Sequence, residues 1–237
     1  MLLIATAMLA AGCESTQEKS AKLAAQAKGL AKPEAGLTVT EESKVVKVGA
    51  TAVLQDANGA AAVVELRNGG TKPLAAVPVA IDVLGAGGQS LFKNDLGGTE
   101  ASLVAAAVLR PSERMYWVHD QVVVSEKPAS VNAAVGADAK PVGGPVPEIA
   151  ISGVKLEEDE TSGTAAVGTL ENHSQIEQRA LVIYAVARKG ERIVAAGRGQ
   201  VPRLKPGAKA PFTVFFIGDA RDGELTLAAP PTVLDGS

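Results

Sequence analysis

Two segments decide the fold: Ala61-Ala62-Val63-Val64-Glu65-Leu66-Arg67-Asn68 and Ala165-Ala166-Val167-Gly168-Thr169-Leu170-Glu171-Asn172. Each is a short apolar run that ends in Leu-x-Asn and is followed by a polar turn. Short apolar runs bounded by turn residues are typical of β-strands. The same run in the same context twice in one chain indicates an internal duplication.

The match continues downstream of both segments. Leu109-Arg110-Pro111 corresponds to Leu204-Lys205-Pro206, and an aromatic residue, Trp117 or Phe212, follows each proline six positions later. Proline cannot donate to a strand ladder, so Leu-x-Pro ends a strand. We therefore expect the following aromatic side chain to enter the core of its own repeat.

The first copy is the longer of the two. Asn68 and Pro111 are 43 positions apart, whereas Asn172 and Pro206 are 34 apart. The additional residues fall within Gly87–Val108. Because function concentrates on loops held by a rigid scaffold, we expect this inserted segment to be a contact surface for a partner.

These repeats define a set of predicted structural positions. The core anchors are Trp117, Phe212, Leu66 and Leu170. The turn and strand-break residues are Asn68, Asn172, Pro111 and Pro206. An Asn side chain can bond its own backbone or accept a left-handed conformation at a turn, which explains these residues without catalysis.

Further strands are predicted at Val45–Val48, Val77–Val83, Gln121–Val124, Ile149–Ile151, Ala180–Val186 and Pro211–Ile217. Strand runs about ten residues apart with almost no helical periodicity predict an all-β fold. We expect two tandem immunoglobulin-like β-sandwich domains, at 38–142 and 148–237. The Pro- and Gly-rich residues 143–147 are predicted to be the linker between them.

At these residues the chain resembles the FxLYD-type and related immunoglobulin-like modules of bacterial lipoproteins. Leu204-Lys205-Pro206-Gly207 fits the strand break of these modules, whereas Leu109-Arg110-Pro111-Ser112 lacks its glycine. Asp82–Gly85 and Tyr184–Val186 stand loosely where the modules carry a Tyr-Asp signature. The resemblance implies β-sandwiches outside the cytoplasmic membrane, with no known catalytic residues and no specified ligand.

The N-terminus indicates how the protein is attached. Residues 1–12 are apolar or small apart from Thr6, and Leu9-Ala10-Ala11-Gly12-Cys13 contains the only cysteine. This pattern predicts a lipoprotein signal peptide (1–12) that is cleaved before a lipidated Cys13. The alternative is a frayed apolar end with an ordinary buried cysteine. Residues 13–37 read as the lipidated Cys13 and a flexible tether, with the lipid on Cys13 as the contact with the membrane.

Composition narrows the function classes. The net charge is −3, which provides no basic field for nucleic acid, so we expect no nucleic-acid partner. Aromatic residues make up only 3% of the chain, and most of its apolar side chains are those of Ala, Val and Leu. Such small side chains suit thin β cores. No motif for a cofactor is found, and none is expected.

The candidates for chemistry are few. His119-Asp120 resembles a metal-binding pair, but metal sites need further ligands and the other histidine, His173, lies in the second repeat. We interpret the pair as polar residues at a strand edge. Glu157–Glu160 is an acidic run at a predicted hairpin tip with at most weak affinity for Ca²⁺. Gly85–Gly88 is followed by no Gly-Lys-Ser/Thr, and is better read as a hairpin loop.

The sequence thus predicts a non-catalytic, lipid-anchored protein of the cell envelope that faces the periplasm or the cell exterior. Its two β-sandwich modules would bind a protein or an envelope component. The alternative is a solute-binding component or an envelope enzyme with an unrecognised site. A solute-binding protein would normally show βαβ alternation, which is not visible, and an enzyme would need convergent titratable groups.

Overall fold

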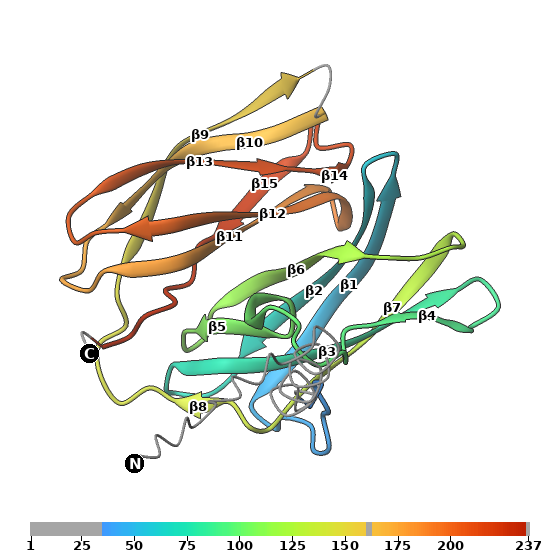
Figure 1. Ribbon diagram of the computed structural model, residues 1–237, viewed down its shortest axis with the longest axis horizontal. Helices are drawn as coiled ribbons and strands as arrows, with labels where there is room; N and C mark the ends of the chain where they lie inside the picture. The colour runs from blue at the N-terminus through green and yellow to red at the C-terminus, as the bar shows by residue number, and fades with distance from the viewer. Residues whose placement is uncertain (1–34, 160–162, 236–237) are drawn as a thin grey trace, which may run out of the picture. The chain divides into compact units, whose positions relative to one another are not determined.

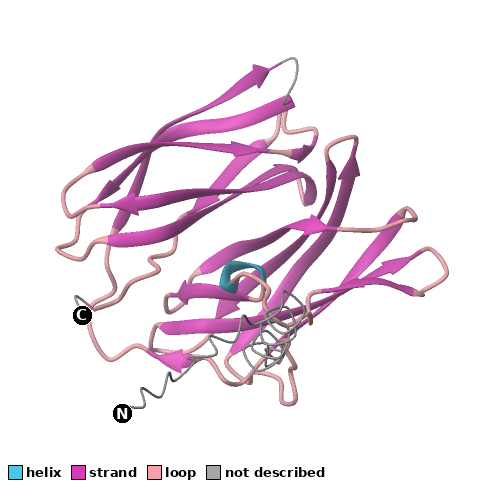
Figure 2. Cartoon of the chain, viewed as in Figure 1, coloured by secondary structure: helices cyan, strands magenta, loops and turns pink. Residues whose placement is uncertain are grey.

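The computed structural model describes residues 35–159 and 163–235. Strands make up 62% of the described residues, so the predicted all-β class is confirmed (Figure 2). The predicted signal peptide, Cys13 and the tether up to residue 34 lie outside the described residues. No helix in the described part of the chain is long and apolar enough to cross a membrane.

Residues 36–141 form the first half of the fold (Figure 1). One antiparallel sheet has the order β1-β2-β6, and in a second sheet β3 pairs with β4, β5, β7 and β8. The bounds are β1 Val46–Asp56, β2 Gly59–Asn68, β3 Leu74–Gly85, β4 Ser90–Lys93, the short 3-10 helix η1 Ala101–Leu103, β5 Ala105–Leu109, β6 Arg114–Val122, β7 Pro128–Val135 and β8 Lys140–Pro141.

The described residues from 149 to 235 form the second half, again with two antiparallel sheets. Their strand orders are β13-β10-β9 and β14-β12-β11-β15. The bounds are β9 Ile149–Asp159, β10 Gly163–Asn172, β11 Gln178–Lys189, β12 Arg192–Leu204, β13 Lys209–Phe215, β14 Ile217–Gly218 and β15 Glu224–Ala228. Within the described ranges, no sheet combines strands from both halves.

One hydrogen-bond pattern fixes the end of β2. Asn68 is fully buried, and its Nδ2 donates to the backbone oxygens of Lys72 (2.9 Å) and Leu109 (3.1 Å). Its Oδ1 accepts from the backbone N–H of Gly70 at 2.9 Å. The side chain therefore closes the turn after β2 and ties it to the end of β5.

The second half repeats this pattern at Asn172, the end of β10. Its Nδ2 donates to Ile176 O (2.8 Å) and Leu204 O (3.1 Å), and its Oδ1 accepts from Ser174 N–H (3.0 Å). The same three kinds of bond, from matched residues to matched neighbours, support the internal duplication.

A shared backbone conformation adds to this similarity. Ala76 has φ 49° and Ala180 has φ 47°, each two residues into the strand that follows the Asn turn. Left-handed φ is uncommon for a residue with a Cβ. Both halves therefore use the same costly bend at the same position.

The halves differ where the sequence predicted an insertion. The second half has one continuous strand, β12, whereas the first half has β4 and β5 separated by residues 94–104. Asn94 substitutes for the missing strand bonds: its Oδ1 accepts from Ile81 N–H, and its Nδ2 donates to Val79 O and Leu103 O. The backbone of β3 thus stays satisfied across the interruption.

Strand β11 is buried on both faces. Side chains alternate between the two faces of a strand, and one set, Leu181, Ile183 and Ala185, packs in a core with β10 and β13. The other set, Val182, Tyr184 and Val186, belongs to the core of the first half. The two halves therefore share a hydrophobic core in addition to the chain that links them.

One predicted strand was misplaced. The run Gln121–Val124 was expected to form a strand, but β6 covers Arg114–Val122 and leaves Val123 exposed. One face of β6 packs on the first half and the other on the second, so its sequence lacks the alternation of apolar and polar residues that marks a one-sided strand. The polar residues Arg114, His119 and Asp120 further obscured the strand in the sequence.

Candidate functional site

The predicted core anchors lie in the hydrophobic core, and the predicted strand-break prolines lie in turns. Leu66, Leu170 and Trp117 are fully buried, and Phe212 is nearly so. Pro111 and Pro206 lie in the turns that follow β5 and β12. Cys13 lies outside the described residues, so its lipidation stays a prediction.

The structure also brings together charged residues that the sequence did not connect with one another. Arg198 lies on β12 between Gly197 and Gly199. A side-chain carbon at Gly197 would collide with Phe215 O, and one at Gly199 would lie 2.6 Å from Thr213 O. These glycines let β12 approach β13 closely, while Arg198 points the other way and meets the first half.

Arg198 binds two carboxylates of the first half. Its Nε donates to Asp120 Oδ1 on β6, and its Nη1 donates to Glu100 Oε1 beside η1, both at 3.0 Å. Its Nη1 also donates to Ser102 Oγ. The side chain of Arg198 is only 9% exposed, against 22% for Asp120 and 45% for Glu100. We call these four residues the Arg198 cluster.

Ser102 connects this cluster to both halves. Its backbone oxygen accepts from Trp117 Nε1 of the first half at 2.9 Å and from the Tyr184 hydroxyl of the second half at 3.4 Å. Its hydroxyl donates to Glu100 Oε1 at 2.6 Å. The inserted segment was predicted to be a contact surface for a partner. Its residues Glu100 and Ser102 instead make contacts within the chain.

The charges in the cluster stabilise one another. Burial alone would raise the pKa of Glu100, but its hydrogen bonds from Ser102 and Arg198 outweigh burial and lower it. Burial alone would lower the pKa of Arg198, but Glu100 and Asp120 outweigh it and raise this pKa. Burial raises the pKa of Tyr184 as well, so its hydroxyl remains a neutral donor.

We expect Arg198→Met to lower the free energy of unfolding by about 2 kcal/mol, because two carboxylates lose their partner but stay partly solvated. Urea unfolding measures this loss. The matched control is Arg203→Met, which removes an exposed ion pair to Glu177 and should cost less than about 0.5 kcal/mol. Equal losses in the two variants would contradict the role of the cluster.

His119 is buried rather than placed at a solvated strand edge. Its ring makes edge contacts with Phe92 (5.1 Å between centroids) and Trp117 (6.0 Å). Its Nδ1 has no hydrogen-bond partner among the described residues. Burial, with the nearby charge of Arg198 adding to it, lowers the pKa of His119 to about 4.

This pKa predicts sensitivity to acid. The unfolded chain binds a proton near the ordinary pKa of 6.5, whereas folded His119 stays neutral until about 4. Its contribution to stability is therefore complete above pH 6.5 and is lost as the pH falls toward 4. From pH 7 to pH 5 the loss is roughly 2 kcal/mol. Unfolding curves of His119→Phe should lack this part of the acid loss, and those of His173→Phe, which changes a half-exposed histidine, should keep it.

An apolar groove of about 420 Å³ lies beside the Arg198 cluster. The first half lines it with residues of β3, η1 and β5, and the second half with residues of β11, β12 and the C-terminal segment. Its lining residues are Ala75, Ala76, Glu100, Ala101, Ser102, Ala105, Ala107, Arg179, Ala180, Val182, Tyr184, Gln200, Thr232 and Leu234. We call this hollow the seam groove.

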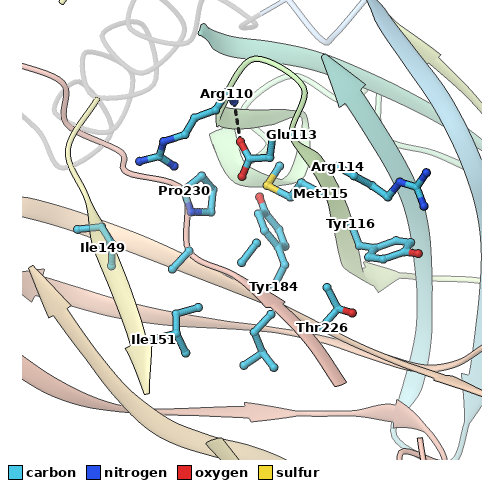
Figure 3. A pocket seen from close by; sticks show the side chains of 13 residues that line it. Arg110, Glu113, Arg114, Met115, Tyr116, Ile149, Ile151, Tyr184, Thr226 and Pro230 are labelled. Atoms are coloured by element: carbon cyan, nitrogen blue, oxygen red, sulfur yellow. Dashed lines mark hydrogen bonds between the residues drawn. The ribbon is translucent and has the colours of Figure 1, made fainter. Parts of the chain in front are cut away.

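A second hollow, of about 220 Å³, is also lined by Tyr184 (Figure 3). It is smaller and more polar at its edge, where Arg110, Glu113 and Arg114 gather. The backbone N–H of Arg110 donates to Glu113 at 2.6 Å, and Arg114 pairs with Glu65 at 2.8 Å. The Arg110 side chain donates from Nη2 to Pro147 O at 2.8 Å. The charged groups at this edge thus already have partners within the chain, which leaves the seam groove as the better candidate site.

The other sequence candidates do not converge. His173 lies within 3.8 Å of Glu148 and 3.5 Å of Glu171, remote in sequence from His119. Glu157–Asp159 end β9 before the hairpin to β10, and Glu160 lies outside the described residues. In the part of the chain that the structure describes, no three His, Cys, Asp or Glu side chains gather as a metal site would require. Gly85–Gly88 joins β3 to β4 as a hairpin, as predicted.

Sequence reasoning missed Arg198, Glu100 and the alanines of the groove. A signal for Arg198 was present, because a single charge between two glycines interrupts the apolar run Val194–Val201.

No protein-family model matches this chain, and no curated protein matches it either.

Proposed function

We propose that this chain is a non-catalytic, lipid-anchored binding protein of the cell envelope, and that the seam groove is its ligand site. The single observation that carries the binding role is the groove: apolar walls from both halves next to a few convergent polar groups. Ligand sites in proteins are typically hollows of 300–1,000 Å³ with this character. At about 420 Å³, the seam groove falls in this range.

The arrangement around the groove supports binding rather than catalysis. The polar groups at its edge, Glu100, Ser102 and Arg198, are engaged with one another. The one hydroxyl among them, Ser102 Oγ, donates to Glu100, but Arg198 also binds this carboxylate and the pKa of Glu100 is lowered, which makes it a weak general base. They hold the two walls of the groove in a fixed relation, which lowers the ordering cost when a ligand binds.

The proposed anchor follows from Leu9–Cys13, with the FxLYD-like character of the repeats as further support. A lipidated Cys13 and the following tether would hold the folded part near a membrane. A flexible chain of about 24 residues has an end-to-end distance of roughly 25–30 Å. The groove would then be presented close to lipid and to other envelope components.

We expect the protein from its native cells to begin at an acylated Cys13 and to sediment with membranes. Cys13→Ala should release it to the soluble fraction, because one residue carries the lipid. Intact-mass measurement and membrane fractionation of the two forms test this. An unmodified chain that retains Met1 and stays soluble would contradict the anchor while leaving the groove open to its own test.

A further inference from the structure

Six of the fourteen residues that line the seam groove are alanines. Ala105 and Ala107 alternate on β5 with the buried Ala106 and Val108, so they point out of the core of the first half. Ala180 from the second half also lines the groove, and like Ala76 of the first it has a left-handed backbone. Val182 and Leu234 add further aliphatic surface from the second half.

This lining selects for the shape of a ligand. Tyr184 is the only aromatic residue among those that line the groove, and its hydroxyl is bound to Ser102. Planar ring ligands are usually held between aromatic faces, which these walls do not supply. A flexible aliphatic chain needs only apolar surface, and each methylene that it buries adds to the free energy of transfer from water.

One exposed cation lies among the residues that line the groove. Arg179 is 75% exposed at its side chain. Its Nε is bound to Glu177, but Glu177 also binds Arg203, so one carboxylate serves two guanidinium groups. The Arg198 cluster has the opposite balance, because Arg198 binds both Glu100 and Asp120. An anionic head group would therefore find its cationic partner at Arg179 and not at the Arg198 cluster.

We infer that the seam groove binds the aliphatic chain of an anionic amphiphile, with the head group at Arg179. This inference rests on the proposed binding function and specifies its ligand class. A fatty acid and an anionic phospholipid share this chemistry, and the test below tells them apart.

The test uses the full-length chain with Cys13→Ala, which cannot carry its own lipid at that residue. Titration with a dansyl-labelled fatty acid should show saturable binding at one site. Ala105→Phe, which fills the groove, should weaken binding about tenfold or more, equivalent to 1.4 kcal/mol or more. The matched control is Ala134→Phe, at a position on β7 that does not line the groove. Thermal melting checks that each variant folds, and Ala107→Leu replaces Ala105→Phe if the latter does not.

Arg179→Gln tests the head group. It should weaken binding of the labelled acid several-fold and leave binding of the matching fatty alcohol unchanged. Vesicles that contain labelled phosphatidylglycerol or phosphatidylcholine distinguish the sources: transfer of phosphatidylglycerol alone identifies a phospholipid, and binding of the free acid without transfer identifies a fatty acid.

No saturable binding of either amphiphile, or equal binding by Ala105→Phe and the unmodified groove, would overturn the inference. Crosslinking in living cells from a photo-reactive residue at position 107 distinguishes failure of the amphiphile inference from failure of the proposed binding function. A crosslinked protein there, with no lipid bound, would overturn the aliphatic ligand and still support a binding role. A crosslinked lipid would support both.

Discussion

Trp117→Ala should lower the free energy of unfolding by about 3–5 kcal/mol, the usual loss for a buried aromatic residue. Trp117 is fully buried, and its indole N–H donates to Ser102 O at 2.9 Å. The substitution therefore leaves a cavity in the core of the first half and frees one end of η1, which carries the contacts to Arg198. Urea unfolding, followed by circular dichroism, measures the loss.

Two controls separate the contributions. Trp117→Phe keeps most of the apolar volume but loses the hydrogen bond, so it should cost clearly less than alanine. Phe215→Ala removes a ring that is 50% exposed and should cost about 1 kcal/mol or less. An unfolding midpoint for Trp117→Ala that equals that of the unmodified protein would refute its role as a core anchor.

Asn172→Ala is expected to cost about 3 kcal/mol, although it removes only a small polar side chain. Leu204 O and Ile176 O lose a donor, and Ser174 N–H loses an acceptor. An unsatisfied buried polar group costs roughly 1–3 kcal/mol. The hydroxyl of Ser174 also donates to Ile176 O, which limits the total.

Asn172→Asp is the informative companion. It keeps the size of the side chain but cannot donate to the two carbonyl oxygens, so it should destabilise the protein at least as much as alanine. Asn132→Ala, at an exposed position, should change stability by less than about 0.5 kcal/mol. If Asn172→Asp were as stable as the unmodified protein, packing rather than hydrogen bonding would explain the residue.

The fold class and the turns that follow β2 and β10 could be predicted because their signals are local. Asn68 and Asn172 each lie at the end of an apolar run, and turn chemistry of this kind depends on neighbours a few residues away. The same holds for the Leu-x-Pro strand breaks at Pro111 and Pro206. Strand β6 was misplaced because its apolar and polar residues do not alternate in the way that a one-sided sheet requires.

The contact between the halves was not predicted, but its signal is visible in retrospect. Val63 and Val64 are adjacent in β2 and both are fully buried, although their side chains point to opposite faces. An uninterrupted apolar run indicates a strand covered on both sides. The bond from Arg198 to Asp120 joins residues 78 positions apart, and no local pattern specifies such a pairing.

The double coverage of β2 and β6 has a consequence for the history of the chain. Val63 pairs with Val118, and Tyr116 on the same face lies under Arg188 of the second half at 6.0 Å. A chain that lost its second half by recombination would leave this apolar face open to water, and such faces promote aggregation. Each half therefore depends on the other for its solubility, and substitutions in this contact are constrained by both.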